Sequence, residues 1–142
     1  MVTAAAVAQV LGGIGRRHGA VSELTLADAV RDGLPISALE RLIESGVIAE
    51  YEVEAHFIPR RTLYARRQKG TLSREQSDLV VRLARIQAIA DGVFDSRQGA
   101  HDWLREKNGA LAGQSPLSLL DTEEGGRLVE AVLGCIAHGI VE

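Results

Sequence analysis

The chain has 142 residues, of which 46% are hydrophobic and 25% are charged, and its formal net charge is −3. These values are typical of one soluble globular unit, or of two small units packed together, and they exclude disordered, collagen-like and low-complexity classes. No apolar run reaches the ~18–20 residues of a membrane span, because arginines such as Arg16, Arg82 and Arg85 interrupt the longest candidates. The single cysteine, Cys135, excludes an internal disulfide and a cysteine-based zinc site, so we expect a reducing cytoplasm and no membrane.

Helical signals dominate the N-terminal third of the chain. Aromatic residues make up only 4% of the sequence and β-branched residues seldom cluster, which predicts an all-α fold. Residues 1–15 are predicted to be a mobile or helical N-terminus rather than a signal peptide, because no basic residue precedes their apolar stretch. Next, we expect a helix that begins with the capping box of Thr25 and Asp28 and ends at Gly33. An amphipathic helix should follow from Pro35 to Gly46. Ile48 to Phe57 should form a short helix or a partly extended segment.

The segment "IPRRTLYARRQKG" predicts a short basic helix between Pro59 and Gly70. Residues 55–90 carry a net charge of +6 between flanks of −4 and −5, and no acidic residue lies between Glu54 and Glu75. Such segregation is typical of a phosphate-binding surface, although a basic surface that pairs with the acidic flanks is the alternative. On a helix, Arg60, Leu63, Tyr64 and Arg67 share one side, on which Leu63 and Tyr64 are expected to form a small apolar anchor. A basic helix on an apolar anchor is what the recognition helix of a helix-turn-helix module requires.

A long helix is predicted from about Arg74 to Phe94, with Ser73 and Gln76 as its capping box and Asp95 and Ser96 as its end. Its apolar stripe is broad, so both flanks should be covered. We expect this helix to join the basic N-terminal module to a C-terminal one, with room for a subunit interface.

The C-terminal third predicts a small helical domain. Ser96 should cap a helix that ends at Asn108 and Gly109, and Ser115 with Pro116 should begin a brief helical turn. Asp121 with Glu124 should cap the last helix. Its apolar side is expected to form one core with Trp103, the alternative being an exposed Trp103 that anchors a partner. The predicted apolar residues of the last helix are Leu128, Val129, Val132, Leu133, Ile136 and Ile140.

The succession of these motifs resembles the Xre/MbcA/ParS family of type II antitoxins. It runs from "IPRRTLYARRQKGTLSREQSDLVVRLARI" to "HDWLREKNGALAGQSPLSLLDTEEGGRLVEAVLGCIAHGIV", and the resemblance covers about residues 33–142. The chain departs from the family pattern at Lys107, where a proline usually precedes the asparagine. The resemblance implies an N-terminal helix-turn-helix module over residues 1–70 and a toxin-binding domain over residues 71–142.

The resemblance also implies the partners: promoter DNA and a RES-domain toxin that degrades NAD or transfers its ADP-ribose. Its implied DNA contacts are Arg60, Arg61, Thr62, Arg66, Arg67 and Lys69, and its implied toxin-facing residues are His138, Gly139, Ile140, Val141 and Glu142. From the residues themselves, the small side chains of the last turn and the negative charge of Glu142 fit a tip that enters an anion-binding cleft. A single short helix offers limited contact area, so we expect a homodimer or a larger assembly on a repeated site, with a two-fold operator for a two-fold protein.

Catalysis by this chain is not expected. Its four histidines lack helical metal-site spacing, "LGGIG" lacks the context of a phosphate loop, and Cys135 is expected to be a buried thiol. The sequence therefore predicts no metal, no cofactor and no enzymatic activity. The alternative function is a stand-alone helix-turn-helix repressor without a toxin partner, and a third option is a scaffold whose basic helix contacts another protein.

Overall fold

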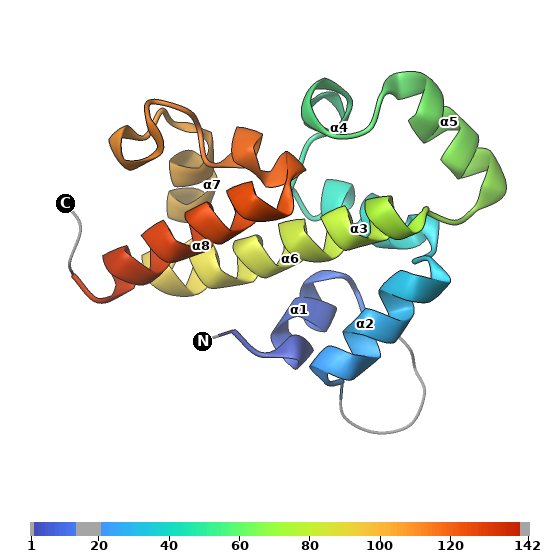
Figure 1. The fold of residues 1–142 in the computed structure, drawn as a ribbon, viewed down its shortest axis with the longest axis horizontal. Helices are drawn as coiled ribbons and strands as arrows, with labels where there is room; N and C mark the ends of the chain where they lie inside the picture. The colour runs from blue at the N-terminus through green and yellow to red at the C-terminus, as the bar shows by residue number, and fades with distance from the viewer. Residues whose placement is uncertain (1, 14–20, 140–142) are drawn as a thin grey trace.

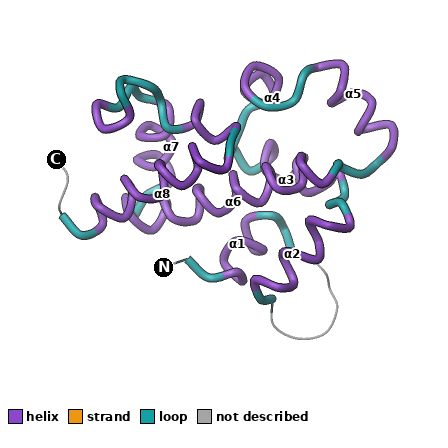
Figure 2. The backbone as a smooth tube through the Cα atoms, in the orientation of Figure 1, coloured by secondary structure: helices purple, strands orange, loops and turns teal. Residues whose placement is uncertain are grey.

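The computed structural model describes residues 2–13 and 21–139, and within these ranges the secondary-structure elements are helices joined by loops (Figures 1 and 2). The all-α prediction is therefore confirmed. Two isolated β-bridges, Pro35 with Thr71 and Asn108 with Gln114, join loops. The helices are α1 (Ala4–Val10), α2 (Glu23–Asp32), α3 (Ile36–Glu44), α4 (Glu50–His56), α5 (Arg60–Lys69), α6 (Arg74–Phe94), α7 (Arg97–Arg105) and α8 (Glu123–Ala137), with 3-10 turns η1 (Gly109–Leu111) and η2 (Leu117–Asp121).

Helix α6 is the spine around which the other helices pack. Ser73 Oγ accepts a hydrogen bond from the backbone N–H of Gln76 at 3.1 Å, and the Gln76 side chain accepts one from the N–H of Ser73 at 2.9 Å. This reciprocal cap confirms the predicted start, and Asp95 ends the helix in the left-handed conformation. Figure 1 shows α8 lying along one side of α6 and α1 with α2 on another. Because both flanks are covered, the broad apolar stripe becomes the centre of the core.

The N-terminal segment is helical over the residues that the structure describes. Thr3 caps α1, and Val7 is fully buried against the core. Contacts with α2 and α6 fix α1 in place. The helical alternative is therefore confirmed for residues 4–10.

Three predicted helix boundaries are wrong, because other residues cap α2 and α8 and because Asn108 belongs to the turn after α7. Ser22, not Thr25, caps α2, and its Oγ accepts from the N–H of Thr25 at 3.2 Å, so Thr25 lies inside the first turn. Thr122, not Asp121, caps α8. Helix α7 ends at Arg105, because Asn108 instead caps η1 by accepting from the N–H of Ala110 at 2.9 Å.

One hydrophobic core runs from α1 to α8 and contains the residues of both halves of the chain. Trp103 packs on its edge, with its ring 5.6 Å from that of Phe94. The prediction that Trp103 belongs to the core is confirmed. Leu128 is an exception among the predicted core residues of α8, because its side chain is 55% exposed. It lies on the outer face of α8, whereas Val129 and Leu133 on the inner face are fully buried.

Candidate nucleic-acid interface and the end of α8

Helices α4 and α5 form a helix-turn-helix unit joined by the three residues 57–59 (Figure 1). The segment from Ile48 to Phe57, for which the sequence allows either a helix or a partly extended structure, therefore contains a helix, α4. Val53 on α4, Ile58 in the turn and Leu63 on α5 are all buried, and the N–H of Ile58 donates to the carbonyl of Val53 at 2.8 Å. These three side chains bury the inner faces of the two helices, which leaves the opposite face of α5 open.

Backbone hydrogen bonds hold the C-terminal end of α5. Pro59 precedes the first helical residue, and Gly70 ends the helix at φ +86°, a left-handed conformation that glycine adopts without strain. The carbonyl of Gly70 then accepts from the N–H of Ile36 at 2.9 Å. Next to it, the N–H of Leu72 donates to the carbonyl of Leu34 at 2.8 Å. The C-terminal end of α5 is thus fixed to the connection between α2 and α3.

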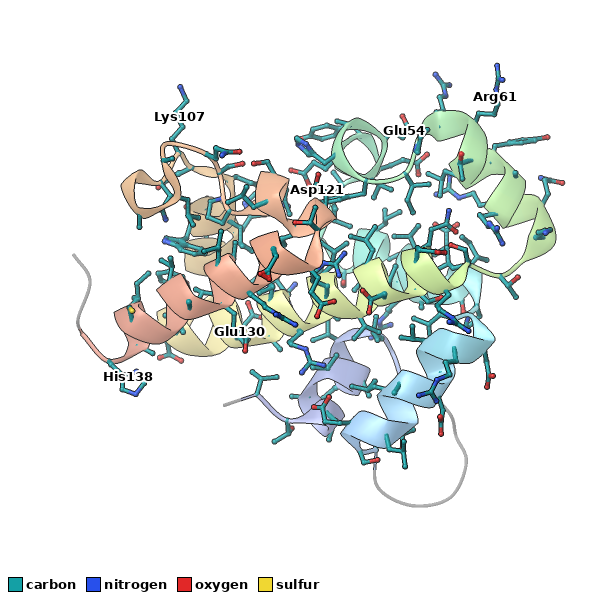
Figure 3. All side chains as sticks on the ribbon, in the orientation of Figure 1. Glu54, Arg61, Lys107, Asp121, Glu130 and His138 are labelled. Carbon is teal, nitrogen blue, oxygen red and sulfur yellow. The ribbon has the colours of Figure 1, made fainter. Side chains whose placement is uncertain are left out.

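Four of the predicted DNA contacts carry charges that are free for a ligand. Arg60, Arg61 and Lys69 are exposed, Arg66 is half-buried, and none of the four forms an ion pair with any residue in the described ranges. Thr62 is half-buried beside them. In Figure 3 the Arg61 side chain projects away from the rest of the molecule. The open face of α5 therefore presents several unpaired cations.

Tyr64 does not belong to the apolar anchor of α5. Its side chain is 66% exposed, whereas Leu63 is 1% exposed. Successive residues on a helix differ by about 100°, so the same rotation that buries Leu63 turns Tyr64 toward solvent. The anchor is Leu63 alone, and Tyr64 lies on the open face, three residues after Arg61.

Arg67 is placed differently from the other five predicted contacts. Its guanidinium donates to Glu40 on α3 through Nε and Nη2, at 2.8 and 3.0 Å. It also donates to Glu50 on α4 through Nη1 and Nη2, at 3.1 and 2.8 Å. These hydrogen bonds from Arg67 lower the pKa of the Glu50 carboxyl and raise that of Arg67. Pairing of the basic segment with its acidic flank, the alternative to a phosphate surface, thus holds for Arg67.

A second ion pair joins α4 to α7. The carboxylate of Glu52, which is 6% exposed, accepts from Arg105 Nε at 2.8 Å and from Arg105 Nη2 at 2.9 Å. Arg105 also donates to the carbonyl of Val47 at 3.2 Å. Sequence reasoning missed this pair, since the two residues are 53 positions apart and no local pattern joins them.

The end of α8 carries the predicted toxin-facing residues. His138 and Gly139 are exposed, whereas Ile140, Val141 and Glu142 lie outside the described residues. His138 Nδ1 lies 2.7 Å from the carbonyl oxygen of Gly134, which holds the imidazole against the helix end. Cys135, expected to be buried, is half-buried one turn earlier.

The two candidate surfaces lie far apart. Figure 1 shows α5 at one end of the long axis of the molecule and the end of α8 at the other. Figure 3 shows the same separation between the labelled side chains of Arg61 and His138.

Within residues 2–13 and 21–139, no cluster of three or more histidine, cysteine or acidic side chains could hold a metal ion, and none of the helices has the length and hydrophobicity of a membrane span.

Two family models match this chain. Residues 25–85 match the antitoxin Xre-like helix-turn-helix domain, which includes α4 and α5. Residues 90–139 match the antitoxin Xre/MbcA/ParS C-terminal toxin-binding domain, which includes α7 and α8. The first match ends at residue 85 and the second begins at residue 90, so both extend into α6.

Curated relatives named antitoxin Xre match most of the chain. The protein from Pseudomonas putida is 33% identical over 119 residues, which cover 83% of this chain and 74% of the relative. The one from Yersinia enterocolitica is 30% identical over 118 residues, covering 81% and 80%. The one from Photorhabdus laumondii is 26% identical over 115 residues, covering 79% and 78%.

Proposed function

Because the chain belongs to the Xre/MbcA/ParS family of type II antitoxins, we propose that its partner is a RES-domain toxin that degrades NAD or transfers its ADP-ribose. We also propose that the antitoxin is cytoplasmic and represses transcription of its own operon. The observation that carries this proposal is that two unlike surfaces lie at opposite ends of the molecule (Figure 1). The open cationic face of α5 suits a polyanion, and the exposed end of α8 suits a protein cleft. An antitoxin that regulates its operon needs both surfaces.

The DNA-binding surface is proposed to consist of Arg60, Arg61, Thr62, Arg66 and Lys69. Their cations are free of carboxylate partners, as phosphate and base-edge contacts require. Each phosphate contact that is lost should reduce the slope of log affinity against log salt concentration by ~0.9.

The test of the DNA-binding surface compares Arg61→Ala and Arg66→Ala with Arg127→Ala, a control on α8 whose exposed arginine pairs with Glu123. Promoter DNA binding should weaken in the first two variants and stay unchanged in the control. Inhibition of the toxin should persist in Arg61→Ala and Arg66→Ala. Loss of both activities in a variant that folds normally would contradict two separate surfaces.

At the other end, His138, Gly139, Ile140, Val141 and Glu142 are proposed to enter the mouth of the NAD site and occlude it. The support is the exposure of His138 and Gly139 and the match of residues 90–139 to a toxin-binding domain. A chain without residues 137–142 should still bind promoter DNA but should fail to stop NAD loss in a toxin assay. Full inhibition by this truncated chain would exclude the occlusion model.

We also propose that two copies of the chain bind DNA together, because the open face of one ten-residue helix is small compared with the ~1,000–2,500 Å² that specific sites usually bury. Two-fold protein symmetry would then match a two-fold operator. Native mass measurement of the chain with and without operator DNA tests this point, and a strictly single copy on the DNA would contradict it.

A further inference from the structure

We propose that Arg67 is a positioning residue that clamps α5 onto α3 and α4, rather than a residue that contacts DNA. This inference rests on the proposed DNA-binding function and concerns how the surface of α5 is held in place. It gives Arg67 a different role from the other five residues predicted to contact DNA, although all six lie in the same basic segment of the sequence.

The first argument is the use of donors. A guanidinium has five N–H groups, and four of those on Arg67 donate to carboxylates at 2.8 to 3.1 Å. Only one N–H remains, whereas recognition of a guanine edge or a bidentate phosphate contact needs two. Arg67 could make such a contact only by giving up one of its carboxylates.

The second argument is the position of the two carboxylates. Glu40 lies on α3 and Glu50 on α4, so one side chain of α5 joins three helices. Backbone hydrogen bonds at Gly70 and Leu72 hold the C-terminal end of α5, and Leu63 is the buried residue of this helix. Arg67 lies one turn after Leu63, so its ion pairs hold α5 against α3 and α4 and thereby position Arg61 and Arg66.

The third argument is charge. Glu50 is about half exposed next to the cationic face, and without a cationic partner its carboxylate would repel phosphate. Hydrogen bonds from Arg67 lower the pKa of Glu50, so this carboxylate and the guanidinium stabilise each other's charged forms. The clamp therefore both orients α5 and offsets part of the negative charge of Glu40 and Glu50 beside it.

The test uses the full chain and operator DNA, with operator affinity and melting temperature measured for wild type, Arg67→Ala, Arg67→Lys and Glu50→Gln. Lysine keeps the positive charge but cannot bridge two carboxylates in bidentate fashion. The clamp predicts that Arg67→Lys loses operator affinity by about tenfold, as Arg67→Ala does, and that both variants melt at lower temperature. Glu50→Gln, which keeps every cation, should also bind operator more weakly, although removal of a negative charge alone would strengthen binding.

Specific outcomes would overturn the proposal. Operator affinity within about twofold of wild type in Arg67→Lys, together with a loss in Arg67→Ala, would make Arg67 a phosphate contact. Lost affinity with an unchanged melting temperature in both variants would make it a base contact. Stronger binding by Glu50→Gln would also contradict the clamp. If wild type itself does not bind DNA while Arg67→Ala and Arg67→Lys melt early, the proposed DNA-binding function fails and the clamp is reduced to a structural contact.

Discussion

The carboxylate of Glu52 and the guanidinium of Arg105 form a two-hydrogen-bond pair, at 2.8 and 2.9 Å, that joins the helix-turn-helix domain to the toxin-binding domain. Glu52 Oε1 also accepts from the N–H of Ala49 at 2.9 Å, so this side chain caps its own helix as well. The pair is largely screened from solvent. Its two charges therefore depend on each other.

Loss of Arg105 should destabilise the whole chain. Arg105→Ala leaves the buried carboxylate of Glu52 without its partner, which should lower the free energy of unfolding by about 3 kcal/mol. Urea unfolding at pH 7, followed by circular dichroism and by the fluorescence of the single Trp103, measures this change. The exposed pair of Arg127 with Glu123 provides the control, since Arg127→Ala should cost less than about 1 kcal/mol. An equal effect of the two substitutions would disprove the special role of the buried pair.

Stability should fall in acid because of the same carboxylate. Burial raises the pKa of Glu52, but hydrogen bonds from Arg105 and from the backbone of Ala49 outweigh burial and leave the pKa below its ordinary value of 4.5. A carboxyl whose folded-state pKa is depressed stabilises the fold above its unfolded pKa, and this contribution disappears as pH falls through the folded pKa. Glu52→Gln should therefore be less stable than wild type at pH 7, and the difference should shrink as pH falls below about 4.5. A difference that is constant from pH 7 to pH 3 would contradict the assignment.

Glycines 125 and 134 on α8 should respond oppositely to substitution by alanine. A Cβ at Gly125 would collide with the carbonyl oxygen of Leu119, which is backbone and cannot move aside, so Gly125→Ala should cost about 2 kcal/mol. Nothing lies within 4 Å of a Cβ at Gly134, so Gly134→Ala should instead stabilise the helix by about 0.5–1 kcal/mol. Melting temperatures of the two variants decide this point, and a destabilised Gly134→Ala would show that the end of α8 is not packed as described.

Ser77 should matter for both stability and DNA binding. It is fully buried on α6, and its Oγ accepts from the N–H of Leu34 at 2.8 Å, next to the bridge that fixes the end of α5. Ser77→Ala leaves that N–H unsatisfied, which should cost about 1–3 kcal/mol and weaken operator binding. Ser37→Ala on the exposed side of α3 is the matched control and should change neither property. Unchanged unfolding of Ser77→Ala would mean that the N–H of Leu34 finds another acceptor.

Local sequence signals predicted the positions of the helices well, but they predicted poorly which residues of different helices contact one another. The bounds of α6 could be predicted because Ser73, Gln76 and Asp95 act on backbone groups within one turn. The starts of α2 and α8 were wrong because more than one nearby residue could cap each helix, and the cap is Ser22 rather than Thr25 and Thr122 rather than Asp121. The division of the chain at residue 70 stays a prediction, since α6 belongs to both halves of the core.

The site was predicted only in part, because its ionic partners are distant in sequence. A helical wheel of α5 shows which residues are basic, but it does not show that Arg67 meets Glu40 and Glu50, which lie 27 and 17 positions away. The same wheel placed Tyr64 beside Leu63, whereas the helix buries only Leu63. Charge pattern indicates a phosphate surface, and tertiary contacts decide which cations belong to it.

Helix α6 spans ~30 Å without interruption and packs at its two ends under different domains. In the function proposed above, it would act as a fixed spacer: a toxin bound at the end of α8 would be carried at a constant offset and angle from the DNA groove that α5 is proposed to enter. Steric exclusion between toxins on neighbouring antitoxin copies would then depend on the spacing of half-sites in the operator, so a change of a few base pairs in that spacing should alter how many loaded copies the promoter accepts.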